Sequence, residues 1–202
     1  MEVRERILLE SGQLFARYGI KSMTMDLLAE EMGISKRTIY ERFKDKDTLL
    51  LEVIRHYQAQ TKADAHEIIE ESENAIVALF RIIRQTIDQM TRLSPTFFHD
   101  FKKYHNKIFN ECMSDPGFRD YSVTSKLLET GVEQGIFRDD FDLQIVNRSI
   151  HALFDLFGHQ SPMLEEGIDR KQMFDHMLIP FFRGLCTEKG QKILEDSKNY
   201  FD

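Results

Sequence analysis

The chain has 202 residues, of which 42% are apolar and 30% are charged, and its net charge at neutral pH is −7. This composition is typical of a soluble globular protein and excludes disordered and collagen-like chains. The acidic balance also argues against a protein that coats nucleic acid or anionic membrane with its whole surface. A local basic patch is still compatible with it.

No segment of the sequence indicates export or membrane insertion. Residues 1–6 are charged and lead into no apolar stretch of signal-peptide length. The apolar run at 75–80 is six residues long, whereas a membrane helix needs about 20. Cys112 and Cys186 are far apart and form no paired motif, which fits a reducing compartment. We therefore expect a cytoplasmic protein without a membrane span, a cofactor or a bound metal.

The first half of the chain lacks the residues that interrupt helices. Glycine is absent between Ile34 and Pro116, and proline is absent before Pro95. Apolar residues recur there at helical spacing, as in Ile76, Leu79, Phe80, Ile83 and Ile87. The pattern predicts an all-α protein with about nine or ten helices.

Two helices are predicted near the start of the chain. The first follows apolar residues at helical spacing from Val3 to Tyr18 and ends at Gly19. The second is short and covers residues 24–32. Thr24 is its expected N-cap, and Asp26 lies in its first turn, where a carboxylate suits the positive end of a helix.

A tight turn and a third helix follow directly. Gly33 is expected to end the second helix in the left-handed conformation that glycine adopts without strain. Ser35 then caps the third helix, which Ile39 and Phe43 pin to the core at i, i+4 spacing. Ala29 is small enough to let the two helices approach closely. Together these features predict a helix-turn-helix.

The third helix lies in the concentrated basic segment of the sequence. Residues 36–46 carry five basic and two acidic side chains, whereas residues 1–60 as a whole carry 10 of each sign. The residues expected to face outward, with donors for base edges and phosphates, are Lys36, Arg37, Thr38, Tyr40 and Arg42. The alternative is an ordinary helical hairpin with a solvated basic face.

A helix predicted over residues 142–158 has an apolar and a polar face. The polar face carries His151, Asp155 and His159 at four-residue spacing, which puts three candidate metal ligands in a row. An all-helical enzyme or metal sensor using them is the alternative from another functional class. A solvated or interface-lining face explains the same residues, and no nucleophile, phosphate-binding or paired-carboxylate motif supports an enzyme.

A helix predicted from about Arg170 to Leu185 is apolar over a broad arc. The arc covers about 240°, against about 100° for a helix buried on one side. So much apolar surface requires two neighbours, of which one is the chain's own core. The same helix of a second subunit is the other, so we expect a homodimer.

About the first 50 residues contain a recognisable set of positions, namely Phe15, Ala16, Gly19, Thr24, Ala29, Gly33, Ile34, Ser35, Tyr40, Phe43, Lys46 and Leu49. Over this set the chain resembles the tetracycline-repressor-like (TetR) family of bacterial transcription regulators. With the helix pattern, this resemblance implies a three-helix DNA-binding domain in residues 1–46. A larger helical domain for effector binding and dimerisation is implied in residues 47–202.

The resemblance also implies roles for individual residues. Lys36, Arg37 and Thr38 would read bases, and Thr24, Tyr40 and Lys46 would hold phosphates. Many members have glycine where this chain has Arg37, so this arginine either reads a guanine or holds a phosphate. The full set of expected DNA-binding residues is Thr24, Ser35, Lys36, Arg37, Thr38, Tyr40, Arg42 and Lys46.

These observations predict a repressor that binds a palindromic operator in double-stranded DNA as a homodimer and is released by a small, mostly apolar effector. The expected pocket residues are Met90, Phe101, Tyr104, His105, Tyr121, His151 and Phe154. The same aromatic residues would also suit a fully packed core. An activator, or a regulator without a small-molecule effector, is the alternative within the family.

Overall fold

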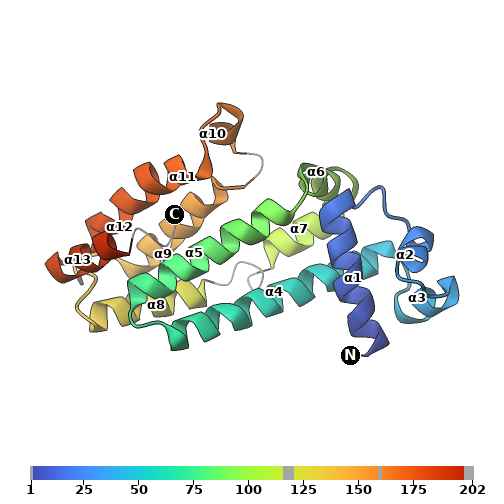
Figure 1. Cartoon of the computed structure of the whole chain (residues 1–202), viewed down its shortest axis with the longest axis horizontal. Coiled ribbons are helices and arrows are strands. Elements are labelled where there is room, and N and C mark those ends of the chain that lie inside the picture. Colours follow the sequence, from blue (N-terminus) through green and yellow to red (C-terminus); the bar gives the residue numbers. More distant parts are fainter. Residues whose placement is uncertain (1, 116–120, 159–160, 198–202) are drawn as a thin grey trace. The chain divides into compact units, whose positions relative to one another are not determined.

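The computed structural model describes residues 2–115, 121–158 and 161–197, and these are folded into helices joined by turns (Figure 1). The predicted all-α fold is confirmed. Contacts divide the chain into two compact units, Met1–Lys62 with Thr91–Arg119 and Ala63–Met90 with Asp120–Asp202. This division describes packing, and the functional boundary after residue 46 stays a prediction. Within the described ranges, no helix combines the length and the apolar character needed to cross a bilayer.

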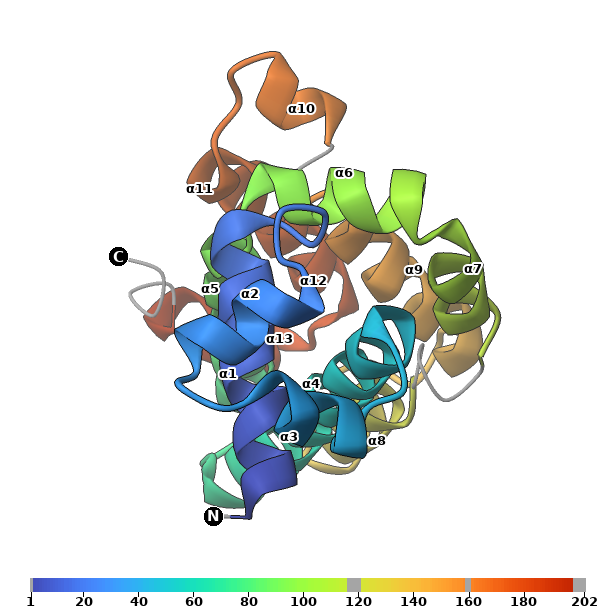
Figure 2. The same ribbon diagram turned by 90° about the vertical axis from the view of Figure 1, so that its right-hand side faces the viewer.

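The first unit joins the helix-turn-helix to two later helices. Its helical segments are α1 (Val3–Tyr18), α2 (Met25–Glu31), α3 (Lys36–Arg42), the first part of α4 (Lys46–Glu71), α6 (Pro95–Tyr104) and α7 (Asn106–Ser114). Figure 2 looks onto this unit, with α2 and α3 in blue and α6 in green. Its core contains Ile7, Phe15, Leu28, Ile39, Phe43, Leu49, Phe101 and Ile108. The helices α6 and α7 therefore complete the core on which α2 and α3 rest.

The boundary between α6 and α7 is not visible in the sequence pattern. Apolar spacing continues from Phe101 to Cys112, but the helix breaks at His105, whose backbone φ and ψ are −122° and 37°. The ring Nδ1 of His105 lies 2.7 Å from Oδ1 of Asp47, in the first turn of α4. This long-range hydrogen bond fixes the side chain at the break.

The second unit is built around a separate core. Its remaining helical segments are α5 (Ala75–Arg92), α8 (Ser122–Glu133), α9 (Leu143–Asp155), α10 (Pro162–Glu165), α11 (Arg170–Met173), the π-helical segment η1 (Phe174–Leu178), α12 (Ile179–Leu185) and α13 (Glu188–Asp196). This core contains the fully buried side chains of Phe80, Phe157, Phe174 and Phe182. The rings of Phe80 and Phe174 meet edge to face, with their centroids 5.4 Å apart.

The helix predicted over residues 170–185 consists of α11, η1 and α12. Pro180 has no N–H to donate to the carbonyl of His176. The series of regular α-helical hydrogen bonds is therefore interrupted, and the preceding turn is π-helical. Together with the break at His105 and the short α10, this interruption gives more helical segments than the nine or ten expected.

Most of the apolar arc of this region packs inside its own subunit. Met173, Phe174, Leu178, Ile179, Phe182 and Leu185 are buried in the second core. Met177 and Phe181 are only partly buried against that core. The chain itself therefore covers much of the surface that the sequence pattern assigned to a second subunit.

Candidate nucleic-acid interface

The N-terminus of α2 is capped as the sequence predicts. The backbone N–H of Leu27 donates to Oγ1 of Thr24 at 3.1 Å, and Asp26 lies in the first turn. A side-chain acceptor here satisfies a backbone donor that has no partner within the helix. Thr24 thus fixes the position at which α2 begins.

The turn between α2 and α3 depends on backbone conformation. Gly33 has a φ of 64°, and a Cβ added there would meet nothing within 4 Å. Glycine is therefore required by the left-handed conformation and not by crowding. The N–H of Ile34 donates to the carbonyl of Ala29 at 2.9 Å, which closes the turn.

A second cap and two buried side chains hold α3. Ser35 Oγ accepts the N–H of Thr38 at 3.0 Å. Ile39 and Phe43 are buried in the first core, as is Ala29 on α2. Phe43 follows the last residue of α3 and forms its C-cap position. The predicted helix-turn-helix, with its caps, its close approach and its core contacts, is confirmed.

The outward face of α3 carries the expected polar side chains. Lys36, Arg37, Tyr40 and Arg42 are exposed, and Thr38 is half-buried. This arrangement presents ammonium, guanidinium and hydroxyl donors from a helix whose opposite side is held in the core.

Two cations of this face already have carboxylate partners. Lys36 Nζ lies 2.5 Å from Oδ2 of Asp26, and this hydrogen bond raises the pKa of Lys36 above its ordinary value. Arg37 Nε donates to Oε1 of Glu41 at 2.7 Å. Both pairs are exposed, so DNA phosphates or base edges can replace the carboxylates.

Lys46 is the first residue of α4 and is half-buried. Burial lowers the pKa of its ammonium, while the carboxylates of Asp100 and Asp47 act in the opposite direction. The side chain is therefore a partly desolvated cation at a helix N-terminus, where backbone N–H groups also point outward. Both features suit a phosphate oxygen.

The predicted pocket residues of the first unit occupy different environments. Phe101 is buried in the first core. Tyr104 is 44% exposed, and its hydroxyl accepts a hydrogen bond from Lys21 Nζ at 3.2 Å. His105 bonds to Asp47, as described above. Within this unit, therefore, Phe101, Tyr104 and His105 lie in the core, at the surface and at a helix break, respectively.

In the second unit, two of the predicted pocket residues are in contact. The rings of Tyr121 and His151 meet edge to face, with their centroids 4.5 Å apart. His151 Nε2 lies 2.8 Å from Oγ1 of Thr124. Phe154 is partly buried against the second core, and Met90 on α5 is half-buried.

Two polar residues that the sequence pattern does not single out, Thr124 and Asn147, complete this contact. Thr124 also bonds to Oδ1 of Asn147, whose amide donates to the carbonyl of Tyr121 at 3.0 Å. Asn147 and Thr124 are both buried. An asparagine beside Val146 on the apolar face of a predicted helix was the available signal, because a buried amide needs partners.

The alternative metal site cannot be assembled from the described residues. His151 and Asp155 lie on α9, whereas His159 lies outside the described residues. Among residues that the structure describes, no three histidine, cysteine or acidic side chains are grouped as a metal site.

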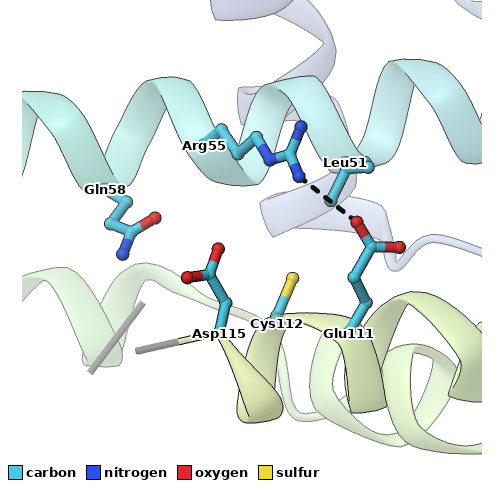
Figure 3. A pocket seen from close by; sticks show the side chains of 6 residues that line it. All are labelled: Leu51, Arg55, Gln58, Glu111, Cys112 and Asp115. Carbon is cyan, nitrogen blue, oxygen red and sulfur yellow. Dashed lines mark hydrogen bonds and ion pairs between the residues drawn. The ribbon is translucent and has the colours of Figure 1, made fainter. Parts of the chain in front are cut away.

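A small polar pocket in the first unit was not anticipated. It lies between α4 and α7, and its lining residues are Leu51, Arg55, Gln58, Glu111, Cys112 and Asp115 (Figure 3). Arg55 and Glu111 form an ion pair of 3.2 Å across it. Burial, followed by the charge of Glu111, raises the pKa of the Cys112 thiol. The thiol is therefore protonated at neutral pH, which makes it a poor nucleophile.

Known proteins are similar to this chain in sequence and in fold. Residues 7–53 match the family described as bacterial regulatory proteins, tetR family. YvaF of Bacillus subtilis (strain 168), an uncharacterized HTH-type transcriptional regulator, is 33% identical over 188 residues, covering 92% of this chain and 96% of its own. The HTH-type transcriptional repressor KstR2 of Mycolicibacterium smegmatis is 27% identical over 161 residues, or 73% of each chain.

Among solved structures, a putative transcriptional regulator from Saccharomonospora viridis in complex with choline aligns with a TM-score of 0.69. It is 24% identical, and the alignment covers 92% of this chain and 98% of that one. This likeness shows the fold. Together with the helix-turn-helix geometry and the full-length similarity to YvaF, it leads to one conclusion: the chain belongs to the TetR family of bacterial HTH-type transcriptional regulators.

Proposed function

We propose that this protein is a transcriptional repressor that reads its operator through α3. The proposal rests on one observation: α3 has an exposed polar face and a buried apolar face. Lys36, Arg37 and Tyr40 are exposed, while Ile39 is fully buried. Such a helix presents donors at a fixed angle, as major-groove docking requires. In this proposal Lys36, Arg37 and Thr38 read base edges.

The remaining members of the predicted set bind the DNA backbone. Tyr40 and Arg42 follow the reading residues on α3, while Thr24 and Ser35 mark the N-termini of α2 and α3. Lys46 marks that of α4. Helix N-termini favour phosphate because their backbone N–H groups and dipoles point at it.

Selection of bound duplexes from a random DNA pool tests this function. We expect the wild-type protein to enrich one palindromic sequence. Selection with the Arg37→Ala variant should enrich sequences with a relaxed base preference at particular operator positions. The reason is that a bidentate contact to guanine discriminates against other bases by about 1–3 kcal/mol. Failure of the wild-type protein to enrich any sequence contradicts the proposal.

We further propose that the operator-binding form is a homodimer. A two-fold symmetric dimer places two recognition helices about one DNA turn apart and so demands a palindrome. On α9, Ile145 is 65% exposed, more than any other large hydrophobic side chain among the described residues. We assign Ile145 to the dimer interface, together with the partly buried Met177 and Phe181.

Ile145 suits a test of the proposed dimer better than Phe182 does. Phe182 is fully buried in its own subunit, so a charge there would disrupt the core. Ile145→Glu should instead yield a folded monomer, which sedimentation detects. This monomer should also bind the operator more weakly than the wild type. Gln144→Glu adds the same charge at the neighbouring exposed residue and should stay dimeric. An Ile145→Glu dimer as tight as the wild type contradicts this interface.

We propose residues 47–202 as the effector-binding and dimerisation domain and residues 1–46 as the DNA-binding domain of a cytoplasmic regulator that performs no catalysis. The contact between Tyr121 and His151, supported by Thr124, offers polar partners beside aromatic surface. The solved relative from Saccharomonospora viridis contains choline, which supports a small-molecule effector for this fold.

An effector is recognised by two effects that occur together. It should raise the melting temperature and release operator DNA, since only a ligand with different affinities for the two states shifts the equilibrium. His151→Leu should weaken both effects and leave operator affinity without effector unchanged. A broad metabolite screen that yields no such compound favours control by abundance or by a protein partner.

A further inference from the structure

A second concentration of positive charge lies outside residues 36–46. Residues 11–25, around the end of α1, carry Arg17 and Lys21 and no acidic residue. Residues 93–110, which include α6, carry three lysines and a single acidic residue, Asp100, which is buried. The exposed members of this basic surface are Arg17, Lys21, Lys102, Lys103 and Lys107. In a chain of net charge −7, a surface of this kind suits a negatively charged partner.

Hydrogen bonds to the backbone hold the two segments together. The N–H of Ser94 donates to the carbonyl of Ala16 at 2.8 Å, and the N–H of Lys21 donates to Oδ2 of Asp100 at 2.7 Å. Figure 2 shows α6, in green, crossing the end of α1 where these bonds lie. The lysines of α6 are thereby fixed to the link between α1 and α2.

Lys21, Lys103 and Tyr104 form a cluster within the basic surface. Lys21 Nζ donates to the hydroxyl of Tyr104 at 3.2 Å and lies 4.3 Å from the centre of its ring. Lys103 Nζ lies 5.4 Å from the same ring centre. The hydrogen bond from Lys21 lowers the pKa of the Tyr104 hydroxyl, and the charge of Lys103 acts in the same direction. Two ammonium groups thus converge on a hydroxyl and not on a carboxylate.

The cations of this cluster differ from those of α3. Lys36 and Arg37 are each paired with a carboxylate. Among the residues that the structure describes, neither Lys21 nor Lys103 forms such a pair. A neutral hydroxyl is a weaker partner for an ammonium group than an anionic oxygen is. An anion that enters the cluster therefore gains two positive charges without displacing a carboxylate.

The position of Lys21 in the chain indicates which anion the cluster meets. Lys21 lies three residues before Thr24, the N-cap of α2, so the Cα atoms of these two residues are at most about 11 Å apart. When a helix-turn-helix docks on DNA, its second helix enters the major groove while its first helix crosses the backbone. With α3 in the groove, the cluster is attached to the end of the helix that crosses the backbone.

We propose that Lys21, Lys103 and Tyr104 bind a phosphate of the operator backbone. In this arrangement a phosphate oxygen accepts from both ammonium groups, and the Tyr104 hydroxyl donates to it. The inference rests on the proposed DNA-binding function and goes beyond its predicted contact set, which contains no residue of α6 or of the link between α1 and α2. It makes α6 a DNA-contacting helix in addition to α3.

Salt dependence provides the first test, with the full-length protein and the selected operator. Lys103→Ala should bind several-fold more weakly, and the slope of log affinity against log salt should fall by about one, because one phosphate contact is lost. The base preference should stay unchanged, since a phosphate contact carries no sequence information. Lys192→Ala removes the same charge at an exposed residue of α13 in the second unit and should match the wild type.

Tyr104→Phe separates a built site from a general charge effect. The substitution keeps the ring and both lysines but removes the hydroxyl that donates to the phosphate. We expect weaker operator binding with an unchanged salt slope, because no charged contact is lost. An effect of net charge alone would leave the affinity of Tyr104→Phe equal to that of the wild type, and this result would overturn the role of Tyr104 in the site.

Operator duplexes that each carry one uncharged methylphosphonate group locate the contact. The wild type should lose affinity wherever the modified phosphate is one that it contacts. Lys21→Ala and Lys103→Ala should both become insensitive at the same phosphate, because the contact is already missing there. Both should stay sensitive at the phosphate where Lys46→Ala becomes insensitive, so the two phosphate contacts are resolved within one series.

Wild-type binding distinguishes this inference from the proposed function. If the wild type selects no operator, the proposed function fails. If it selects one, and Lys21→Ala and Lys103→Ala keep its affinity and salt slope or share no phosphate at which they are insensitive, the inference is overturned and the proposed function stands. Lys21, Lys103 and Tyr104 are exposed, so the variants should fold. Lys21→Gln or Lys103→Gln replaces any alanine variant that circular dichroism shows to be unfolded.

Discussion

The carboxylate of Asp26 on α2 lies 2.5 Å from the ammonium of Lys36 at the start of α3. The adjacent cation, Arg37, is bonded in the same way to Glu41 one turn further on. Both cations among the residues expected to read bases therefore have a carboxylate partner without DNA. In the proposed complex the operator replaces both carboxylates, and each exposed pair contributes little to stability in water.

Asp26→Asn should increase affinity for random-sequence DNA several-fold at low salt. The substitution leaves Lys36 without its competing carboxylate and removes one negative charge from the DNA-binding face. Fluorescence anisotropy with a labelled non-operator duplex measures the effect. Glu129→Gln, an exposed charge change on α8 in the second unit, is the control and should have no effect. Equal affinities of Asp26→Asn and wild type would show that Lys36 does not approach the duplex.

Lys46→Ala and Arg37→Ala should separate two kinds of contact. Lys46→Ala should weaken all duplexes alike and lower the salt slope by about one, because a phosphate contact carries no sequence information. Arg37→Ala should act mainly at particular base positions if the arginine reads a base, by about 1–3 kcal/mol. Titrations with the operator and with single-base variants of it, repeated at several salt concentrations, give both the salt slope and the free energy of base discrimination. Unchanged operator affinity in both variants would contradict the assignment of this face.

Two glycine substitutions should have opposite effects on stability. Gly33→Ala places a Cβ on a residue with a φ of 64°, so we expect a loss of about 1 kcal/mol. Gly184→Ala lies within α12, where a Cβ meets nothing within 4 Å, and should stabilise by about 0.5–1 kcal/mol. Urea unfolding of the two variants gives the comparison, and a Gly33→Ala protein as stable as the wild type would contradict the role of the left-handed turn.

Both cysteines should resist alkylation at pH 8. Burial raises the pKa of the Cys186 thiol to about 11 from an ordinary value of 9.0, and the pKa of Cys112 is raised as well. The folded state therefore retains the Cys186 proton more strongly than the unfolded chain. The resulting stability is fully present below pH 9.0 and is lost as the pH rises towards 11.

Iodoacetamide labelling followed by mass spectrometry, with and without urea, checks the reactivity. Unfolding midpoints between pH 8 and pH 11 check the linkage, and they should fall less steeply in Cys186→Ala than in the wild type. Rapid labelling of Cys186 in the folded protein at pH 8 would contradict its burial.

The helix-turn-helix was predictable because its determinants are local. Thr24, Gly33 and Ser35 act on backbone groups within four residues of themselves, so their spacing in the sequence is also their spacing in space. Ile39 and Phe43 follow the same helical period. The exposed polar face of α3 could thus be drawn from residue order alone, whereas the ion pair between Lys36 and Asp26 required the positions of two helices.

The remaining features depend on contacts between distant residues. The helix break at His105 coincides with a bond to Asp47, 58 residues away, and no glycine or proline marks it. The burial of Asp100 follows from a bond to the backbone of Lys21, 79 residues away. Apart from Met90, the predicted pocket residues have aromatic or polar side chains. Residue type alone does not determine whether an aromatic side chain lies in one of the two cores or at the surface.

The paired charges of α3 affect how long the protein stays on the wrong DNA. A random duplex meets a recognition surface whose two leading cations are already compensated by Asp26 and Glu41, so its counterions are displaced with little gain. We therefore expect short dwell times on such sequences, after which the protein samples others. At the proposed operator, shaped contacts are expected to replace both carboxylates at once, so that a long-lived complex forms only there.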